Sequence, residues 1–310
     1  MVAITIKKDI AVQGVGLHSG VPCEVVLRPA RAGGVVLRRG EKGWDDFVLT
    51  PENVGKYSRP TPLCTRLENG SGARISTPEH LLSALHGLGV NHCLIDVSAE
   101  EIPILDGSAL PWVEALDRAG RVALEEVETP SLSVVKPILY EAEGRVLTAE
   151  PMPLEGRRYG VLAGSPRGAQ CRYEVPGLDA SAWGGLRVDC TVDFPHPMIG
   201  RQVWDGVVDE ATYRREIAPA RTFVLEQDIA AAQAAGLAKG GGLHNAVVFG
   251  VDGRVLNPEG LRFPNEPVRH KVLDFIGDIY LAGRVVCGAF HLTAPGHSAN
   301  AGLLGRVVAG

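Results

Sequence analysis

The spacing of apolar and polar residues near the end of the chain predicts an amphipathic helix over residues 269–278, RHKVLDFIGD. On a helical wheel with about 100° per residue, His270, Asp274 and Asp278 form one polar stripe, and the apolar residues gather on the opposite side. Side chains four residues apart on a helix are neighbours. His270 and Asp274 could therefore bind one metal ion. The alternative for this stretch alone is a solvated pair beside Lys271.

A second helix is predicted over residues 76–89, STPEHLLSALHGLG. Thr77 suits the N-cap and Pro78 the first helical position, leucines recur at helical spacing, and two glycines end the pattern. Glu79 and His80 then lie in the first turn. This pair indicates a general base beside a metal-binding imidazole, the adjacency found in H-E-x-x-H proteases. The alternative is an acid that complements the helix dipole beside an exposed histidine.

The rest of the pattern combines short strands with a few helices in both halves of the chain. Strands that follow one another in sequence favour an α+β fold over a doubly wound sheet. Residues 125–130 are polar and end in a proline, so we place a boundary there between domains 1–126 and 127–310. Residues 151–185 have weak periodicity, and residues 296–300 are expected to form a loop. The other predicted strands are 3–12, 24–27, 35–39, 93–98, 132–140, 145–148, 186–194, 246–249, 254–256 and 284–293, and the other predicted helices are 111–119, 209–218 and 226–235.

Composition narrows the class of protein. The chain has 310 residues, of which 45% are hydrophobic and 22% charged, so it can bury substantial cores. A net charge of −5 gives no general attraction to nucleic acid or to an anionic membrane. The sequence contains no leader pattern and no apolar run long enough for a transmembrane segment. We expect a cytoplasmic protein with six reduced cysteines and no evident obligate protein partner.

Six motifs occur together in an order and at spacings that resemble one family, the zinc-dependent UDP-3-O-acyl-N-acetylglucosamine deacetylases of bacterial lipid A synthesis. Each motif is short and weakly specific by itself, but six in sequence are highly specific. The resemblance runs from about residue 4 to about residue 303. The motifs are GVGLHSG (14–20), STPEHLLSALHGLG (76–89), EIPILDGSA (101–109), ARTF (220–223), GLRFPNEPVRHKVLDFIGD (260–278) and GHSAN (296–300).

The resemblance implies two related two-layer α/β sandwich domains with the active site between them. It implies a hydrolase that removes the N-acetyl group from UDP-3-O-acyl-N-acetylglucosamine, giving UDP-3-O-acyl-glucosamine and acetate, the committed step of lipid A biosynthesis. The implied ligands of Zn²⁺, with Fe²⁺ as the alternative metal, are His80, His270 and Asp274. The implied catalytic residues are Glu79 as general base, His297 as general acid or charge stabiliser, Asp278 as the carboxylate that orients His297, Thr222 as oxyanion donor and Lys271 as a substrate contact.

Substrate-binding residues follow from the same resemblance. Cys64 matches a cysteine near the metal that is not required as a ligand, and two groups of residues match a uracil site and an acyl-chain passage. Ala294 stands where a basic residue is usual, and we expect Lys271 or Arg145 to supply the missing cation near the diphosphate. His244 stands where an aspartate is usual. The uracil residues are Asp193 and Phe194, and the passage residues are Leu17, Phe223 and Ile229.

The chemistry of the ligand set agrees with this assignment, because two imidazoles and a carboxylate leave a fourth position open on zinc, as catalytic sites require. Two alternatives remain. One is a zinc amidohydrolase that acts on a different N-acyl sugar, which would need neither the uracil site nor the acyl passage. The other is a non-catalytic module that binds nucleotide sugars.

Overall fold

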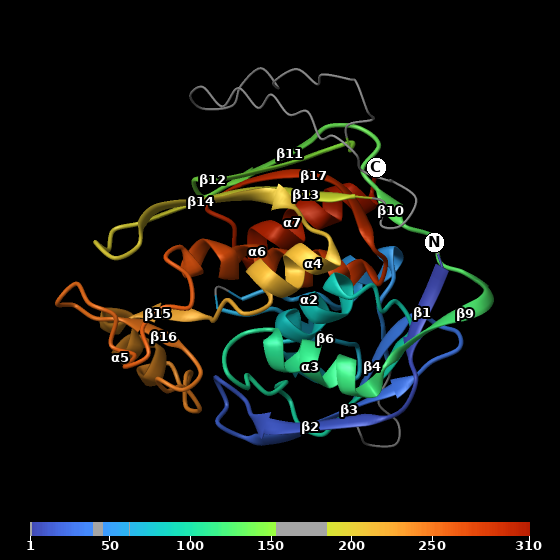
Figure 1. Cartoon of the computed structure of the whole chain (residues 1–310), viewed down its shortest axis with the longest axis horizontal. Coiled ribbons are helices and arrows are strands. Elements are labelled where there is room, and N and C mark those ends of the chain that lie inside the picture. Colours follow the sequence, from blue (N-terminus) through green and yellow to red (C-terminus); the bar gives the residue numbers. More distant parts are fainter. Residues whose placement is uncertain (1, 40–45, 62, 153–184) are drawn as a thin grey trace.

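The computed structural model describes residues 2–39, 46–61, 63–152 and 185–310. The protein is built of two outer β-sheets with helices between them (Figure 1). One pair of helices covers the inner face of the N-terminal sheet, and a second pair covers the inner face of the C-terminal sheet. These helices are α2 (Glu79–Gly87) and α3 (Leu110–Ala119), and α6 (Glu266–Ile279) and α7 (His297–Val308). The expected α+β class is confirmed.

The N-terminal sheet has five strands in the order β2-β3-β8-β4-β5. Strand β3 shows why the sequence forms it, since Cys23, Val25 and Leu27 are buried while the residues between them are less so. The strands are β2 (Ile10–Val15), β3 (Pro22–Pro29), β4 (Val35–Arg39), β5 (Phe47–Val48) and β8 (Cys93–Val97). All neighbours are antiparallel except β4 and β8.

The C-terminal sheet follows the order β11-β12-β17-β13-β14, and β10 (Leu132–Ser133) pairs in parallel with β17. Its strands are β11 (Ile138–Ala142), β12 (Arg145–Glu150), β13 (Leu186–Phe194), β14 (Gly200–Val207) and β17 (Val286–Thr293). All neighbours along this order are antiparallel except β13 and β17.

The two sheets have the same topology. Counted along the chain and without β10, both follow the strand order 1-2-5-3-4, in which strands 3 and 5 pair in parallel and the other neighbours are antiparallel. In both halves one helix precedes the fifth strand and another follows it. Helices α2 and α6 therefore occupy equivalent places in two copies of one α+β unit, and they pack against each other between the sheets.

Each unit carries an insert between its fourth strand in chain order and the helix before its last strand. The first insert contains the 3-10 helix η1 (Pro51–Asn53), α1 (Val54–Tyr57), β6 (Arg66–Glu68) and β7 (Arg74–Ser76). The second contains α4 (Glu210–Thr212), the π-helix η2 (Tyr213–Ile217), β15 (Phe223–Leu225), α5 (Glu226–Ala234) and β16 (Val247–Phe249). The short helix η3 (Tyr280–Ala282) follows α6.

Strand β9 (Arg121–Glu128) runs through the position where we placed the domain boundary. It pairs with β1 (Val2–Ile6) in a separate two-stranded sheet. The chain therefore leaves the first half as part of a paired strand. Of the weakly periodic segment 151–185, residues 153–184 lie outside the described residues.

Several local predictions were wrong. Thr77 is not the N-cap of α2: its φ is +57°, its hydroxyl donates to Glu101, and Pro78 takes the cap position. Residues 254–256 form only an isolated bridge, between Val255 and Phe249, with backbone hydrogen bonds from Gly250 to Arg254 and from Leu256 to Val248 on either side of it. The predicted strand 132–140 is split into β10 and β11 by a segment that contains Pro137, which has no N–H to donate. By contrast, the helix predicted over 209–218 is confirmed over 210–217, as α4 continued by the π-helix η2, in which the amide of Ala218 bonds to the carbonyl of Tyr213.

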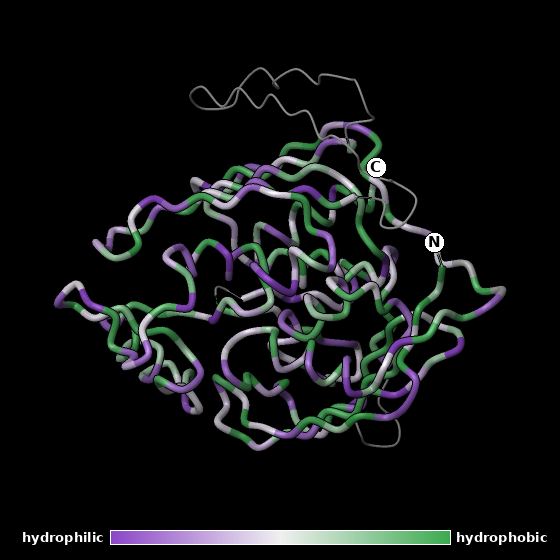
Figure 2. The backbone as a smooth tube through the Cα atoms, viewed as in Figure 1, coloured by the Kyte–Doolittle hydropathy of each residue, from purple (hydrophilic) through white to green (hydrophobic). Residues whose placement is uncertain are grey.

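The core is continuous from the N-terminal sheet through the helices to the C-terminal sheet. Its helical layer nevertheless carries hydrophilic segments among the hydrophobic ones (Figure 2). The five cysteines of the described residues are free thiols, as expected. None of the helices in the described part of the chain has the length and apolar character needed to span a lipid bilayer.

Candidate active site

The candidate active site lies where α2 crosses α6, and a glycine allows the close crossing. A Cβ atom added to Gly277 would lie 2.0 Å from the backbone oxygen of Glu79, which is closer than any side chain could be placed. The backbone of Glu79 therefore rests directly on α6. The following residue, His80, lies beside His270 and Asp274 of α6.

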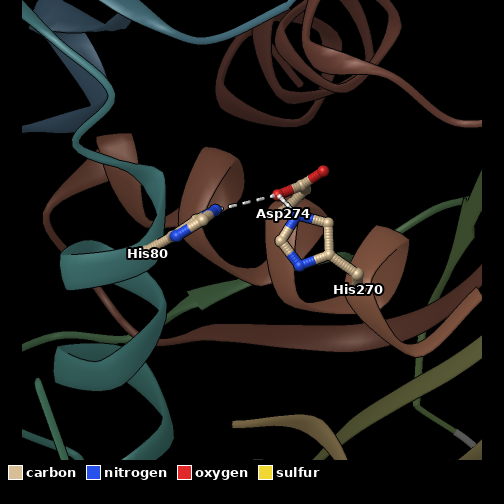
Figure 3. Close-up of side chains that lie close together, drawn as sticks. All are labelled: His80, His270 and Asp274. Carbon is tan, nitrogen blue, oxygen red and sulfur yellow. Dashed lines mark ion pairs between the residues drawn. The ribbon is translucent and has the colours of Figure 1, made fainter. Parts of the chain in front are cut away.

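Three side chains from these two helices form the centre of the site (Figure 3). His80 comes from α2, and His270 and Asp274 lie one turn apart on α6. One carboxylate oxygen of Asp274 is 3.2 Å from Nε2 of His270 and 3.7 Å from Nε2 of His80. All three residues are buried, and their ligand atoms lie within 4.8 Å of one another. The solvated His–Asp pair and the exposed His80, which we kept as alternatives, are therefore wrong.

The hydrogen bonding of His270 shows that a cation fits this cluster. Nδ1 of His270 is 3.1 Å from the carbonyl oxygen of Ala220, and a carbonyl can only accept, so Nδ1 carries the proton. Nε2 then directs a lone pair towards the carboxylate of Asp274. Burial lowers the pKa of His270 to about 3, so a second proton does not relieve this contact between two acceptors. A divalent metal ion would relieve it.

Lys271 stabilises the negative charge of Asp274. Its Nζ is 2.8 Å from the second carboxylate oxygen of Asp274. Burial acts to raise the pKa of Asp274, but its charged and hydrogen-bonding neighbours, the Lys271 ammonium among them, outweigh burial and hold this pKa well below its usual value. Asp274 is therefore ionised, which is the state that binds a metal.

A second cluster contains Glu79, His297 and Asp278. Nε2 of His297 is 3.8 Å from Oε1 of Glu79, and Nδ1 of His297 is 2.9 Å from Oδ2 of Asp278. Burial raises the pKa of Glu79 to about 7, although the nearby His297 acts to lower it. Burial also opposes the charged form of His297, but Asp278 outweighs it and raises the pKa of His297 to about 9. The site thus pairs a carboxylate that can accept a proton with an imidazolium that can donate one.

A cavity of about 100 Å³ joins the two clusters, and both halves of the chain line it. Thr222 and Phe223 reach it from the second insert, and Leu17 reaches it from the loop after β2. It also receives Lys271, whose Nζ lies 5.7 Å from the centre of the Phe223 ring. The structure therefore brings together most of the predicted site residues, namely Leu17, Glu79, His80, Thr222, Phe223, His270, Lys271, Asp274 and His297.

Cys64, Asp193, Phe194 and Ile229 are not among the residues that line this cavity. Burial raises the pKa of the Cys64 thiol to about 11, so this thiol is protonated at neutral pH. The ring of Phe194 meets the edge of Phe223 at 5.3 Å between centres, and Asp193 is exposed beside it. Ile229 is half-buried on α5, a helix without fully buried residues.

The two candidate cations near Ala294 are both engaged. Arg145 donates from Nη1 to the carbonyl oxygen of Ala294 at 3.0 Å and to that of Pro295 at 3.4 Å, so its guanidinium lies beside position 294. Lys271 is bound to Asp274 in the cavity. His244 is exposed, next to Asn245.

Several residues of the site were not predicted from the sequence, and one segment was assigned the wrong structure. Residues 296–300 do not form the predicted loop, because His297 begins α7. The buried residues Leu303, Leu304 and Val307 of this helix lie beyond the GHSAN motif, from which the loop was predicted. His18 lines the cavity, and Glu101 holds its loop by accepting the backbone N–H groups of His18 and Ser19. Both lie in motifs that we identified, but a motif does not show which of its residues are buried.

Replacing Gly277 by alanine should weaken metal binding, because the added methyl group must push α2 away from α6 and His80 away from Asp274. We expect a loss of metal affinity of roughly 10- to 100-fold and a lower melting temperature from overpacking. Gly305→Ala on α7 is the matched control, since nothing lies within 4 Å of its added methyl group. Metal titration and thermal unfolding measure both effects, and unchanged metal affinity in Gly277→Ala would contradict the role of this crossing.

Comparison with known sequences shows the family to which the chain belongs. A sequence model of the UDP-3-O-acyl N-acetylglycosamine deacetylases matches residues 3–162 and 171–309. A UDP-3-O-acyl-N-acetylglucosamine deacetylase of Histophilus somni (strain 129Pt) is 40% identical over 303 residues, which cover 97% of this chain and 88% of the relative. The UDP-3-O-acyl-N-acetylglucosamine deacetylase of Anaeromyxobacter dehalogenans (strain 2CP-C) is 39% identical over 306 residues, which cover 98% of this chain and 87% of the relative. The match spans nearly the whole length of both chains, and this chain therefore belongs to the UDP-3-O-acyl N-acetylglycosamine deacetylase family.

Proposed function

We propose that the protein is a metal-dependent hydrolase that removes the N-acetyl group from UDP-3-O-acyl-N-acetylglucosamine and releases acetate. The product is UDP-3-O-acyl-glucosamine, so the reaction is the committed step of lipid A biosynthesis. One observation carries the proposal: the buried cluster of His80, His270 and Asp274 lies in one cavity with Glu79 and His297, in a chain that belongs to this deacetylase family.

The proposed metal ligands are His80, His270 and Asp274, and the proposed ion is Zn²⁺, with Fe²⁺ as an alternative at the same site. Two imidazoles and one carboxylate are a ligand set of catalytic zinc sites, which keep one position open for water or substrate. When bound, such an ion polarises the acetyl carbonyl and lowers the pKa of a coordinated water.

Glu79 is the proposed general base. Its carboxylate is buried in the cavity and has a pKa of about 7, raised by burial, so it can take a proton from an attacking water near neutral pH. The crossing at Gly277 fixes its backbone beside the metal ligands. This supports a role for Glu79 in activating water rather than in binding the ion.

His297 is the proposed general acid. Asp278 holds its Nδ1, which leaves Nε2 facing Glu79 and the cavity. A protonated His297 can stabilise the negative charge of the tetrahedral intermediate and protonate the leaving amine. Thr222, which lines the same cavity, is the proposed donor to the oxyanion, and Lys271 is proposed to contact the substrate.

For the rest of the substrate, we propose that Asp193 and Phe194 bind the uracil, and that Leu17, Phe223 and Ile229 contact the acyl chain. Support comes from the placement of Leu17 and Phe223 on the wall of the cavity and from the contact between the rings of Phe194 and Phe223. Arg145 is the proposed diphosphate contact, because its guanidinium lies beside Ala294.

The test combines elemental analysis of the purified protein with an assay of acetate release from UDP-3-O-acyl-N-acetylglucosamine. We expect one divalent metal ion per chain and acetate release that stops with a chelator and returns with added Zn²⁺. Acetate release from other N-acetyl sugars at equal rates would favour the broader amidohydrolase. Tight binding of the UDP-sugar without any release would favour a binding module.

A further inference from the structure

Thr65 lies between the two groups to which we assign proton transfer. It directly precedes β6 in the first insert and is almost fully buried, with 1% of its surface exposed. Its hydroxyl donates a short hydrogen bond of 2.6 Å to Oδ1 of Asp278. Its backbone N–H points at both carboxylate oxygens of Glu79, at 3.4 and 3.3 Å.

The donors around Asp278 come from different halves of the molecule. Oδ2 accepts from Nδ1 of His297 at 2.9 Å and from Nδ2 of Asn300 at 2.8 Å, and both of these residues belong to α7. Oδ1 accepts from Thr65. Among the described residues that donate to Asp278, Thr65 is the one from the N-terminal half, which also carries Glu79.

The backbone of Thr65 is tied to α2. Its carbonyl oxygen accepts the N–H of Thr77 at 2.9 Å, two residues before Glu79. Thr65 and Glu79 are therefore fixed to the same end of the same helix. The hydroxyl of Thr65 then links this end of α2 to the carboxylate that orients His297.

We propose that Thr65 is a positioning residue for the deacetylation. Through Asp278 it fixes the imidazole of His297 relative to the carboxylate of Glu79, which lie 3.8 Å apart. This inference rests on the proposed function for the roles of Glu79 and His297. A hydroxyl donor is required at this position because a buried carboxylate oxygen that loses its donor is strongly destabilised, and Asp278 would turn to recover a partner.

Thr65→Val tests the proposal, since it keeps the shape of the side chain and removes the donor. We expect kcat for acetate release to fall roughly 10- to 100-fold, the worth of one hydrogen bond to a buried charge, while KM and metal content stay near those of the wild type. Thr65→Ser keeps the hydroxyl and should recover most of the activity. Thr5→Val is the control, because Thr5 is also buried and its hydroxyl is also hydrogen-bonded, to the N–H of Ala30 in the N-terminal half. Equal kcat in Thr65→Val and Thr5→Val would overturn the inference.

A double-mutant cycle distinguishes positioning from a general structural effect. If Thr65 acts through His297, Thr65→Val should lower kcat little further in a His297→Ala background. The same fold loss in both backgrounds would overturn the proposal. Thr65→Ala, which also removes the hydroxyl, takes the place of Thr65→Val in every comparison if the valine variant does not fold.

NMR provides a readout that does not depend on activity. The proton on Nδ1 of His297 should resonate far downfield because it is hydrogen-bonded to a buried carboxylate. We expect this signal to shift in Thr65→Val and to stay in place in Thr65→Ser and Thr5→Val. An unchanged signal in Thr65→Val would overturn the inference. A wild-type protein that releases no acetate would instead overturn the proposed function, and the NMR comparison would still decide whether Thr65 positions His297.

Discussion

Replacing Glu79 by glutamine is expected to lower kcat by roughly 10²–10⁴, the usual contribution of one proton-transfer group, without loss of metal. Glutamine preserves the size of the side chain and can still accept the N–H of Thr65, but it cannot take a proton from water. His297→Gln should lower kcat by a similar factor, because the neutral amide cannot protonate the leaving amine. Glu141→Gln, on the exposed edge strand β11, is the matched control and should change nothing.

The pH profile of the same variants separates the two roles. Glu79 must be ionised to act, so activity should rise with pH through its pKa of about 7. His297 must be protonated, so activity should fall as the pH passes its pKa of about 9. The wild type should therefore show a bell-shaped profile, Glu79→Gln should lose its acidic limb, and His297→Gln should lose its alkaline limb. Loss of the metal from Glu79→Gln would make Glu79 a ligand and reverse the assignment.

The α6 side of the site could be predicted from the sequence because it is local. His270 and Asp274 are separated by one helical turn, and the apolar residues of the same helix fix which way this turn faces. Burial of the polar stripe could not be predicted, because it depends on α2, which lies almost 200 residues earlier and packs on the polar side. A helical wheel shows which side of a helix is polar, but not what covers that side.

The repeat of the α+β unit was expected from the family resemblance, but the pattern of apolar and polar residues does not show it. Strand order and the direction of pairing depend on contacts between distant segments, and the short patterns that predict strands carry no information on their partners. The contact of Thr65 with Asp278 could not be predicted for a related reason. It stands in a loop without periodicity, and only the assembly of α2, α6 and the first insert brings its hydroxyl to Asp278.

The second large effect concerns the substrate: UDP-N-acetylglucosamine without the 3-O-acyl chain should be processed at least 10³-fold less efficiently than the acylated sugar. Burial of acyl methylenes contributes about 0.8 kcal/mol each, so five of them contribute about 4 kcal/mol, which corresponds to about 10³ in kcat/KM. Of the proposed passage residues, Leu17 and Phe223 line the cavity next to the metal ligands, and Ile229 lies on α5 of the second insert.

Two variants distinguish the contribution of the acyl passage from that of the uracil site. Phe194→Ala should lower kcat/KM for both substrates by the same factor, because both contain uracil, and the ratio between the substrates should not change. Ile229→Ala should lower kcat/KM for the acylated sugar alone, so the ratio should shrink. Steady-state kinetics on the two UDP-sugars measure this ratio directly. Equal efficiency of the wild type on both sugars would leave the metal chemistry intact, but it would contradict the acyl passage and favour an amidohydrolase with a broader range of N-acyl sugars.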